Sequence, residues 1–237
     1  MTLWARLTWQ TADPSALAAD LERRLGITGR DGGLVLGARL LDLGSAELEV
    51  RPWVREGPAD RPRRAGRLML EPVPGGEPEP SPVLGVVPPP ALLALGWATV
   101  DLDRAEADLD MWLALDQGPV EGIEPSLGAT TRVRGTRGLP GTWIVLLEPV
   151  TEGRVAAALA RDDEGPCALY LQPPAGLDDW LAEAASRGVE TRSGIRRDGP
   201  FGRQALLAGG PAAGPHIVMV EGLRPSPVIG ATGTIRA

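Results

Sequence analysis

Two stretches of the chain, residues 7–26 and 95–115, begin with alternating apolar and polar positions and continue with apolar positions at helical spacing. In the first stretch, Leu17, Leu21 and Leu25 recur as one helix face does. Each stretch is therefore predicted to be a short strand followed by a helix. Identical residues also occur in both at one constant offset: Leu7 and Leu95, Trp9 and Trp97, Thr11 and Thr99, Asp13 and Asp101, Ala19 and Ala107, Asp20 and Asp108, Leu21 and Leu109, and Leu25 and Leu113. Such internal similarity indicates repeated units, with an aspartate at each junction where a helix N-cap is expected.

A similar closing strand that ends in a glutamate occurs in three places: LMLEPV at 68–73, VLLEPV at 145–150 and VMVEG at 218–222. Between these landmarks the apolar pattern predicts strands at 34–43, 46–53, 66–73, 129–134, 142–150, 167–172, 190–196, 203–208 and 216–221, and helices at 153–161 and 177–187. The Gly- and Pro-rich stretch 116–128 is predicted to be loosely structured. The predicted fold class is α+β, built from three β-α-β-β-β units.

The composition along the chain predicts where these units separate. Residues 1–74 hold one unit, and residues 75–91 form a linker rich in proline. Residues 92–222 hold the second and third units as one domain, and residues 223–237 are a tail without periodicity.

Charge and residue usage exclude several classes of function. The net charge of −7 argues against nucleic acid as a partner, because phosphate binding requires a basic face. No apolar run is long enough to span a membrane, and the N-terminus does not have the pattern of a signal peptide. Cys167 is the one cysteine, so an intrachain disulfide is excluded and a cytoplasmic protein is expected. All 24 basic residues are arginine, as is typical of a GC-rich bacterial genome, and this excludes Schiff-base and P-loop lysines.

Residues 159–189, LARDDEGPCALYLQPPAGLDDWLAEAASRGV, resemble the opening of the second module in epimerase-like members of the vicinal oxygen chelate superfamily. TVDLDRA at 99–105 and LLEP at 146–149 resemble signatures of the first module, and FGRQALLAG at 201–209 is similar to the penultimate strand. This superfamily includes glyoxalase I, methylmalonyl-CoA epimerase, extradiol dioxygenases and bleomycin-resistance proteins. The resemblance implies that the second and third units form a complete glyoxalase-like cup, with residues 1–74 as an additional unit.

The resemblance also implies a divalent metal held by residues of the first and last strands of each module. The positions to which it assigns these ligands are occupied by apolar residues: Ala94, Val145, Ala168 and Val218. The equivalent positions in the first unit, Arg6 and Leu68, are no better suited. Because alanine and valine cannot coordinate a cation, the sequence predicts no metal and no cofactor.

Strand alternation predicts which other side chains face the same cup. The expected ligand-binding residues are Trp143, Tyr170, Gln172 and His216. Each of them also has a purely structural explanation, as a core aromatic residue or a half-exposed residue at a strand end. By the same alternation, Trp9 and Trp97 face away and pack under helices, and the closing glutamates lie near solvent. Cys167 is expected to be a small buried residue rather than a nucleophile, since no feature nearby in sequence would lower its pKa.

These observations leave three functions open. The first is a metal-free protein that binds a small apolar or aromatic molecule in the cup between the second and third units. The second is an isomerase- or lyase-type enzyme of the same superfamily, acting through an unrecognised metal set or through His216. The third is a structural or interaction protein whose cup is filled by its own side chains.

The first unit has no internal mate, although its strands and helix carry a full apolar set. A single β-α-β-β-β sheet covers half a cup and leaves an apolar face exposed to water, which is unfavourable. We therefore predict a homodimer in which two first units pair across a two-fold axis. The alternative is a monomer with the first unit packed on the outside of the 92–222 domain.

Overall fold

The computed structural model describes the larger part of the chain: residues 4–11, 13–27, 33–36, 39–45, 63–65, 68–72, 89–115, 118–137, 139, 141–208 and 214–222. The strand expected at 46–53, most of the linker and the tail 223–237 lie outside these residues. None of the helices within the described ranges has the length and apolar character needed to cross a membrane.

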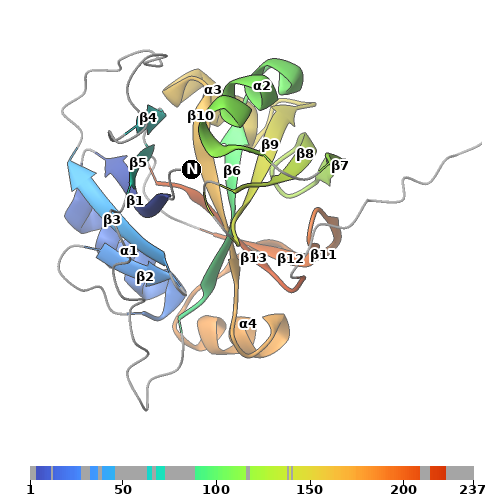
Figure 1. The fold of residues 1–237 in the computed structure, drawn as a ribbon. Coiled ribbons are helices and arrows are strands. Elements are labelled where there is room, and N and C mark those ends of the chain that lie inside the picture. The colour runs from blue at the N-terminus through green and yellow to red at the C-terminus, as the bar shows by residue number, and fades with distance from the viewer. Residues whose placement is uncertain are drawn as a thin grey trace, which may run out of the picture.

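The second and third units form one eight-stranded sheet in the order β11-β12-β13-β10-β6-β9-β8-β7. The second unit comprises β6 (Ala91–Ala98), α2 (Leu102–Leu113), β7 (Val120–Glu124), β8 (Ala129–Gly135) and β9 (Trp143–Pro149). The third unit comprises β10 (Gly165–Gln172), α4 (Leu177–Ser186), β11 (Thr191–Gly199), β12 (Gly202–Leu207) and β13 (His216–Val220), and α3 (Arg154–Asp162) connects the two. In each unit the first strand runs parallel to the last, and the units join through antiparallel β6 and β10. The sheet curls into a half-barrel, which confirms the α+β fold with a glyoxalase-like cup (Figure 1).

The repeated strand–helix junction has the same local structure in both copies. Asp13 caps α1 (Pro14–Leu25), and its Oδ1 accepts a hydrogen bond of 2.9 Å from the backbone N–H of Ala16. Asp101 caps α2 in the same way through the N–H of Arg104, at 3.0 Å. Each aspartate satisfies a backbone donor that the first helical turn leaves without a partner. The similarity of the two sequences therefore reflects one capped turn used twice.

The first unit departs from the expected order of strands. Its sheet has the order β2-β3-β1-β5-β4, built from β1 (Trp4–Thr11), β2 (Gly33–Leu36), β3 (Arg39–Ser45), β4 (Arg63–Ala65) and β5 (Leu68–Pro72). The predicted strand 34–43 is a hairpin of β2 and β3, and β3 takes the closing position parallel to β1. β5 lies on the other side of β1 and runs antiparallel to it. Equating residues 68–73 with 145–150 was therefore wrong, because a shared strand pattern does not determine the direction of pairing.

β7 was also missed in the stretch that we expected to be loosely structured. Its residues are exposed or half-buried up to Glu124, so no apolar alternation marks it in the sequence. It pairs antiparallel with β8, from Val120 opposite Val133 to Glu124 opposite Ala129. β7 and β11 are the two edges of the sheet, and they approach each other as the sheet curls.

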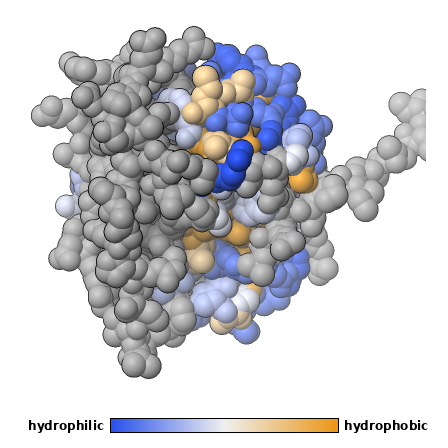
Figure 2. Space-filling view, in the orientation of Figure 1, coloured by the Kyte–Doolittle hydropathy of each residue, from blue (hydrophilic) through white to orange (hydrophobic). Residues whose placement is uncertain are grey.

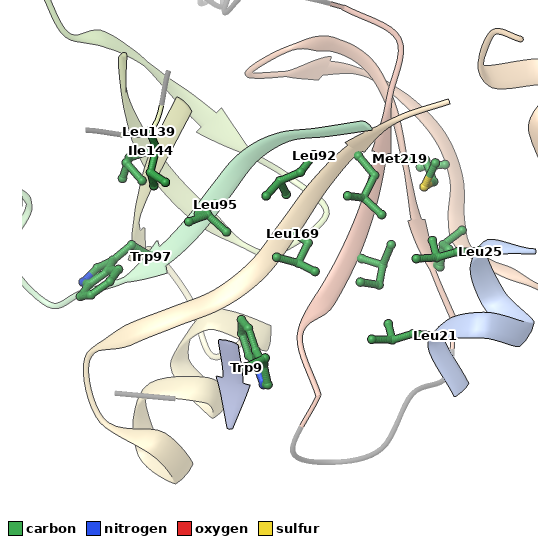
Figure 3. Close-up of a cluster of buried hydrophobic side chains, with 14 of the residues drawn as sticks. Trp9, Leu21, Leu25, Leu92, Leu95, Trp97, Leu139, Ile144, Leu169 and Met219 are labelled. Atoms are coloured by element: carbon green, nitrogen blue, oxygen red, sulfur yellow. The ribbon is translucent and has the colours of Figure 1, made fainter. Parts of the chain in front are cut away.

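The convex face of the large sheet packs against helices and against the first unit. One buried cluster joins Trp97 and Leu169 of this face to Trp9, Leu21 and Leu25 of the first unit. Figure 3 shows Leu21 and Leu25 on α1 near Met219, and Trp9 near Leu169. The prediction that the tryptophans Trp9 and Trp97 pack on this face, under helices, is confirmed.

Trp9, Leu17, Leu21 and Leu25 of the first unit are thus covered by the same chain. Arg24 of α1 is also buried there, donating to the carbonyl of Leu207 at 3.5 Å and pairing with Asp20. This packing matches the alternative arrangement in which the first unit lies outside the 92–222 domain. The homodimer stays a prediction, but it is not needed to cover Leu17, Leu21 or Leu25.

Large apolar side chains on the described surface are few and scattered. Val100, Met111, Ile123 and Val150 are exposed. In the view of Figure 2, hydrophilic residues predominate on the coloured surface and hydrophobic ones form small separate patches. Single apolar residues of this kind are normal on a protein surface and indicate no interface.

Candidate functional site

The centre of the cup is closely packed. Ala94, Val145, Ala168 and Val218 are all 0% exposed and lie in one apolar cluster on the concave face. At Gly96, between them, an added Cβ would lie 2.7 Å from the Cβ of Ala168 and 3.2 Å from the Tyr170 ring. A side chain at this position would force its neighbours apart, so glycine is required there.

Helix α3 closes one end of the cup. Val155 and Ala158 belong to the same buried cluster, and the helix contacts β6, β9 and β10. Its N-cap residue, Gly153, has no side chain that could cap the helix. The guanidinium of Arg154 instead holds the start of the helix by donating from Nη1 to the carbonyl of Ser126, at 2.8 Å.

The predicted site residues lie on the cup side of the sheet by their register but differ in burial. Trp143 and Tyr170 flank Ala94 in one row across β9, β6 and β10. Tyr170 is 0% exposed, whereas Trp143 is half-buried against the cluster. Gln172 and His216 are half-buried, with His216 opposite Ala168 in the neighbouring row and Gln172 at the end of β10. That these four residues line one cavity stays a prediction.

The concave face also carries a buried carboxyl group, Glu124, at the end of β7. Glu124 is 0% exposed, and its oxygens accept three hydrogen bonds from different parts of the sheet. Gln204 Nε2 donates to Oε1 at 2.6 Å, the backbone N–H of Ser126 donates to Oε1 at 3.0 Å, and the Tyr170 hydroxyl donates to Oε2 at 3.2 Å. These contacts join β7 to β10 and β12, so the polar cluster links the two halves of the curled sheet.

Burial dominates the ionisation of this cluster. It raises the pKa of Glu124 from 4.5 to about 7, although the hydrogen bonds from Ser126, Gln204 and Tyr170 act in the opposite direction. The pKa of the Tyr170 hydroxyl is raised as well, first by burial and then by the adjacent Glu124. Near neutral pH, Glu124 can therefore be present in both its protonated and its ionised form, whereas an exposed glutamate is ionised.

The backbone around the cluster keeps these side chains in place. The turn after β7 closes on Glu124, whose carbonyl accepts from the N–H of Leu127 at 3.2 Å and from that of Gly128 at 2.9 Å. On the opposite side, a Cβ at Gly199 would overlap the Gln204 side chain. The Gln204 Oε1 and the Thr131 hydroxyl are buried without a hydrogen-bond partner among the described residues. Such buried polar atoms are costly, and they are a reason to expect water or a ligand nearby.

Sequence reasoning missed Glu124 and Gln204 for different reasons. Glu124 lies in β7, which has no apolar alternation, so no local signal identified it. Gln204 lies in the predicted strand 203–208, and alternation from Leu206 would have placed it on the cup face. A lone polar residue at an inward position of an apolar strand was the available signal.

Basic side chains gather at the end of the cup where β12 ends and β13 begins. We call them the basic rim: Arg24, Arg154, Arg161, Arg192 and His216. Burial, followed by the positive charges of the four arginines, lowers the pKa of His216 to about 4. His216 is thus neutral at pH 7. Arg24 pairs with Asp20 and Arg161 with Asp162, but Arg154 and Arg192 have no carboxylate partner among the described residues.

Cys167 lies in the same apolar cluster and is 7% exposed. Burial raises the pKa of its thiol to about 12, so the thiol is protonated at neutral pH. This agrees with the expectation of a small buried residue rather than a nucleophile.

The residues present do not fit the divalent metal that the resemblance implies. The four assigned positions carry no donor atom, and no group of three or more histidine, cysteine, aspartate or glutamate side chains lies close enough to bind a metal in the described ranges. Glu124 is one carboxylate on this face, and both its oxygens are engaged by protein donors.

We therefore expect purified protein to contain no stoichiometric divalent metal. The physical reason is that binding requires several oxygen, nitrogen or sulfur ligands at fixed distances. Elemental analysis after dialysis checks this directly. The prediction would be contradicted if the dialysed protein kept one equivalent of zinc, nickel, cobalt, manganese or iron, and if a chelator removed both the metal and a function of the protein.

Comparison with protein families and with curated proteins found no match to this sequence. Solved structures do match. The 4-hydroxymandelate synthase of Streptomyces coelicolor is 14% identical with a TM-score of 0.63, and the similarity covers 96% of this chain and 95% of that one. Methylmalonyl-CoA epimerase from Mycobacterium tuberculosis is 25% identical over 55% of this chain and 87% of its own, with a TM-score of 0.49. A Streptomyces coelicolor methylmalonyl-CoA epimerase is 21% identical over 54% and 96%, with a TM-score of 0.45.

The first of these similarities extends over nearly the whole of both chains, so it includes the first unit as well as the eight-stranded sheet. At this level of identity it is informative about the fold alone. Together with the strand order of the cup, it identifies the architecture: the chain has the vicinal oxygen chelate fold.

Proposed function

We propose that the protein binds a small, largely apolar or aromatic molecule in the cup between the second and third units, without a metal. The observation that carries this proposal is Glu124, a carboxyl group fully buried on the concave face together with the polar side chains of Gln204 and Ser126. Burying such a group is unfavourable. No positive charge is among the causes that act on Glu124, and burial raises its pKa. Perturbed ionisable groups of this kind concentrate at functional sites.

The polar cluster defines what such a molecule contacts. Glu124 and Tyr170 present a carboxyl and a hydroxyl group, and Gln204 Oε1 is an acceptor without a partner among the residues that the structure describes. The surrounding Leu127, Phe201 and other apolar side chains provide the nonpolar contact that ligand sites require. Val155 and Ala158 of α3 pack against these side chains in the same cluster.

Native mass spectrometry of protein purified from its own host tests the proposal. The expected result is a retained small molecule that is lost in Glu124→Gln, because the amide replaces the acceptor oxygen Oε2 with an NH₂ donor. Glu152→Gln is the matched control, since Glu152 is exposed and the substitution removes the same charge. If the purified protein carries no small molecule and binds none of the compounds tested, the result would contradict the proposal. It would support a structural or interaction protein whose cup is filled by its own side chains.

A second candidate is an isomerase- or lyase-type enzyme that transfers a proton through Glu124. The observation that favours it is the Glu124 pKa of about 7, which suits an acid–base catalyst at neutral pH. The two candidates differ in Glu124→Gln once a ligand is identified. In an enzyme, the variant keeps binding and loses turnover, together with exchange of a ligand proton for solvent deuterium. In a binding protein, affinity itself falls and the wild type shows no exchange.

A further inference from the structure

The register of the sheet places part of the basic rim on the cup face. In the strand register, Arg192 of β11 lies opposite Leu206 of β12, and Leu206 lies opposite Val218 of β13. Both Leu206 and Val218 belong to the apolar cluster of the cup. His216 pairs with Ala168 of the same cluster. Residues opposite each other in a sheet direct their side chains to the same face. Arg192 and His216 therefore belong to the cup face, with the Arg192 side chain exposed and that of His216 half-buried.

Arg154 connects this rim to the buried polar cluster. It donates from Nη1 to the carbonyl of Ser126, whose N–H donates to Glu124 and whose hydroxyl accepts from Gln204. The rim and the cluster are thus adjacent parts of one end of the cup. An elongated molecule can contact the apolar interior and the rim at once.

The positive charges of the rim are only partly balanced by carboxylates of the described residues, since Arg24 pairs with Asp20 and Arg161 with Asp162. Arg154 and Arg192 lack a carboxylate partner among the described residues, whereas other arginines, such as Arg132 and Arg203, each contact two or more carboxylates. The chain as a whole has a net charge of −7, so this gathering of cations runs against its overall charge. The pKa of His216 is lowered first by burial and then by the nearby arginines. Like charges held together in this way attract an anion.

We propose that Arg154, Arg192 and His216 form a binding site for the carboxylate of a small organic acid whose apolar part enters the cup. The inference rests on the small-molecule function proposed above and names the class of ligand. A guanidinium group matches a planar carboxylate through two parallel N–H donors, and a neutral imidazole contributes one further donor. The molecule is accordingly an anion with an aromatic or aliphatic body, which a neutral analogue of the same shape does not replace.

His216 is the one histidine of the chain, so its ring resonances report on this site alone. The experiment titrates the full-length protein at pH 7 and constant ionic strength with benzoate, with benzamide and with inorganic phosphate. We expect benzoate to shift the His216 resonances saturably, while benzamide does not. Arg192→Gln should lower the affinity for benzoate by about tenfold or more, because the substitution removes one charge-assisted hydrogen-bonding partner.

Two further variants separate the site from general effects. Arg192→Lys keeps the charge but loses the paired donors, so its affinity should lie between those of the wild type and Arg192→Gln. Arg137→Gln is the matched control, because Arg137 is exposed and is not among the residues that act on His216. It should bind benzoate as the wild type does, and thermal melting confirms that each variant is folded.

Several results would overturn the inference. Equal responses to benzoate and benzamide that Arg192→Gln leaves unchanged would show an apolar site without anion recognition, and the small-molecule function would still stand. A response to phosphate as strong as that to benzoate would show a general anion site rather than one for organic acids. No response to any of the three would also overturn it, and the retained molecule in native mass spectrometry would then decide the proposed function separately.

Discussion

The stability of Glu124→Gln relative to that of the wild type is expected to increase progressively as the pH rises from about 4.5 to about 7. The folded-state pKa of Glu124 is about 7 and the reference value is 4.5. Between these values the unfolded chain releases the proton while the folded protein keeps it, so the stability of the wild type falls with rising pH. A shift of this size corresponds to roughly 3 kcal/mol, reached in full above pH 7 and absent below about pH 4.

Urea denaturation of both proteins at a series of pH values between 4 and 8 measures this difference. The glutamine side chain keeps the shape of the cluster but does not titrate, so the two stability curves should diverge over this interval. Glu152→Gln should follow the wild type, because Glu152 is exposed. Parallel curves for Glu124→Gln and wild type would contradict the burial of an acid with a raised pKa.

Leu21→Ala is expected to destabilise the whole chain by about 2 to 5 kcal/mol, the range for removing a buried leucine side chain from a packed core. Leu21 of α1 is 0% exposed and shares one cluster with Leu25, Leu169 and Met219. The substitution opens a cavity between the first unit and the convex face of the large sheet. Because this core is shared, the cost should appear in the unfolding of both parts together. Chemical denaturation followed by tryptophan fluorescence measures it.

Met111→Ala is the control for the loss of a large apolar side chain, since Met111 is 63% exposed on α2. It should change stability by less than about 0.5 kcal/mol. The same measurement repeated over a range of protein concentrations addresses the predicted homodimer. If two first units pair across this face, the unfolding midpoint rises with concentration. If the face is covered within one chain, the midpoint is constant.

The two effects have a common structural origin in the two faces of one sheet. The convex face supplies stability by packing helices and the first unit in one large apolar cluster, beside which Arg24 is buried. The concave face combines small residues, such as Gly96 and Ala168, with the buried acid Glu124. Polar groups buried without full hydrogen bonding lower stability. The separation suits a fold in which one face holds the protein together and the other carries the candidate site.

Local features of the chain were sufficient to predict the repeated units. The N-caps Asp13 and Asp101, the helical spacing of Leu17, Leu21 and Leu25, and the strands of the third unit all depend on neighbours within one or two turns. The direction in which Trp9, Trp97 and the cup-side residues face follows from the two-residue period of a strand. These properties are encoded within short stretches, so the sequence by itself determined them.

Contacts between distant residues were decided only by the tertiary structure. The hydrogen bond from Gln204 to Glu124 joins residues 80 positions apart, and no spacing along the chain records it. The antiparallel placement of β5 beside β1, and the covering of Leu21 and Leu25 by the third unit, likewise depend on which surfaces meet. A strand pattern is the same for either direction of pairing, and an apolar helix face is the same for any apolar partner. The choice between partners is therefore made by long-range packing, which is why the buried acid and the position of the first unit emerged from the fold alone.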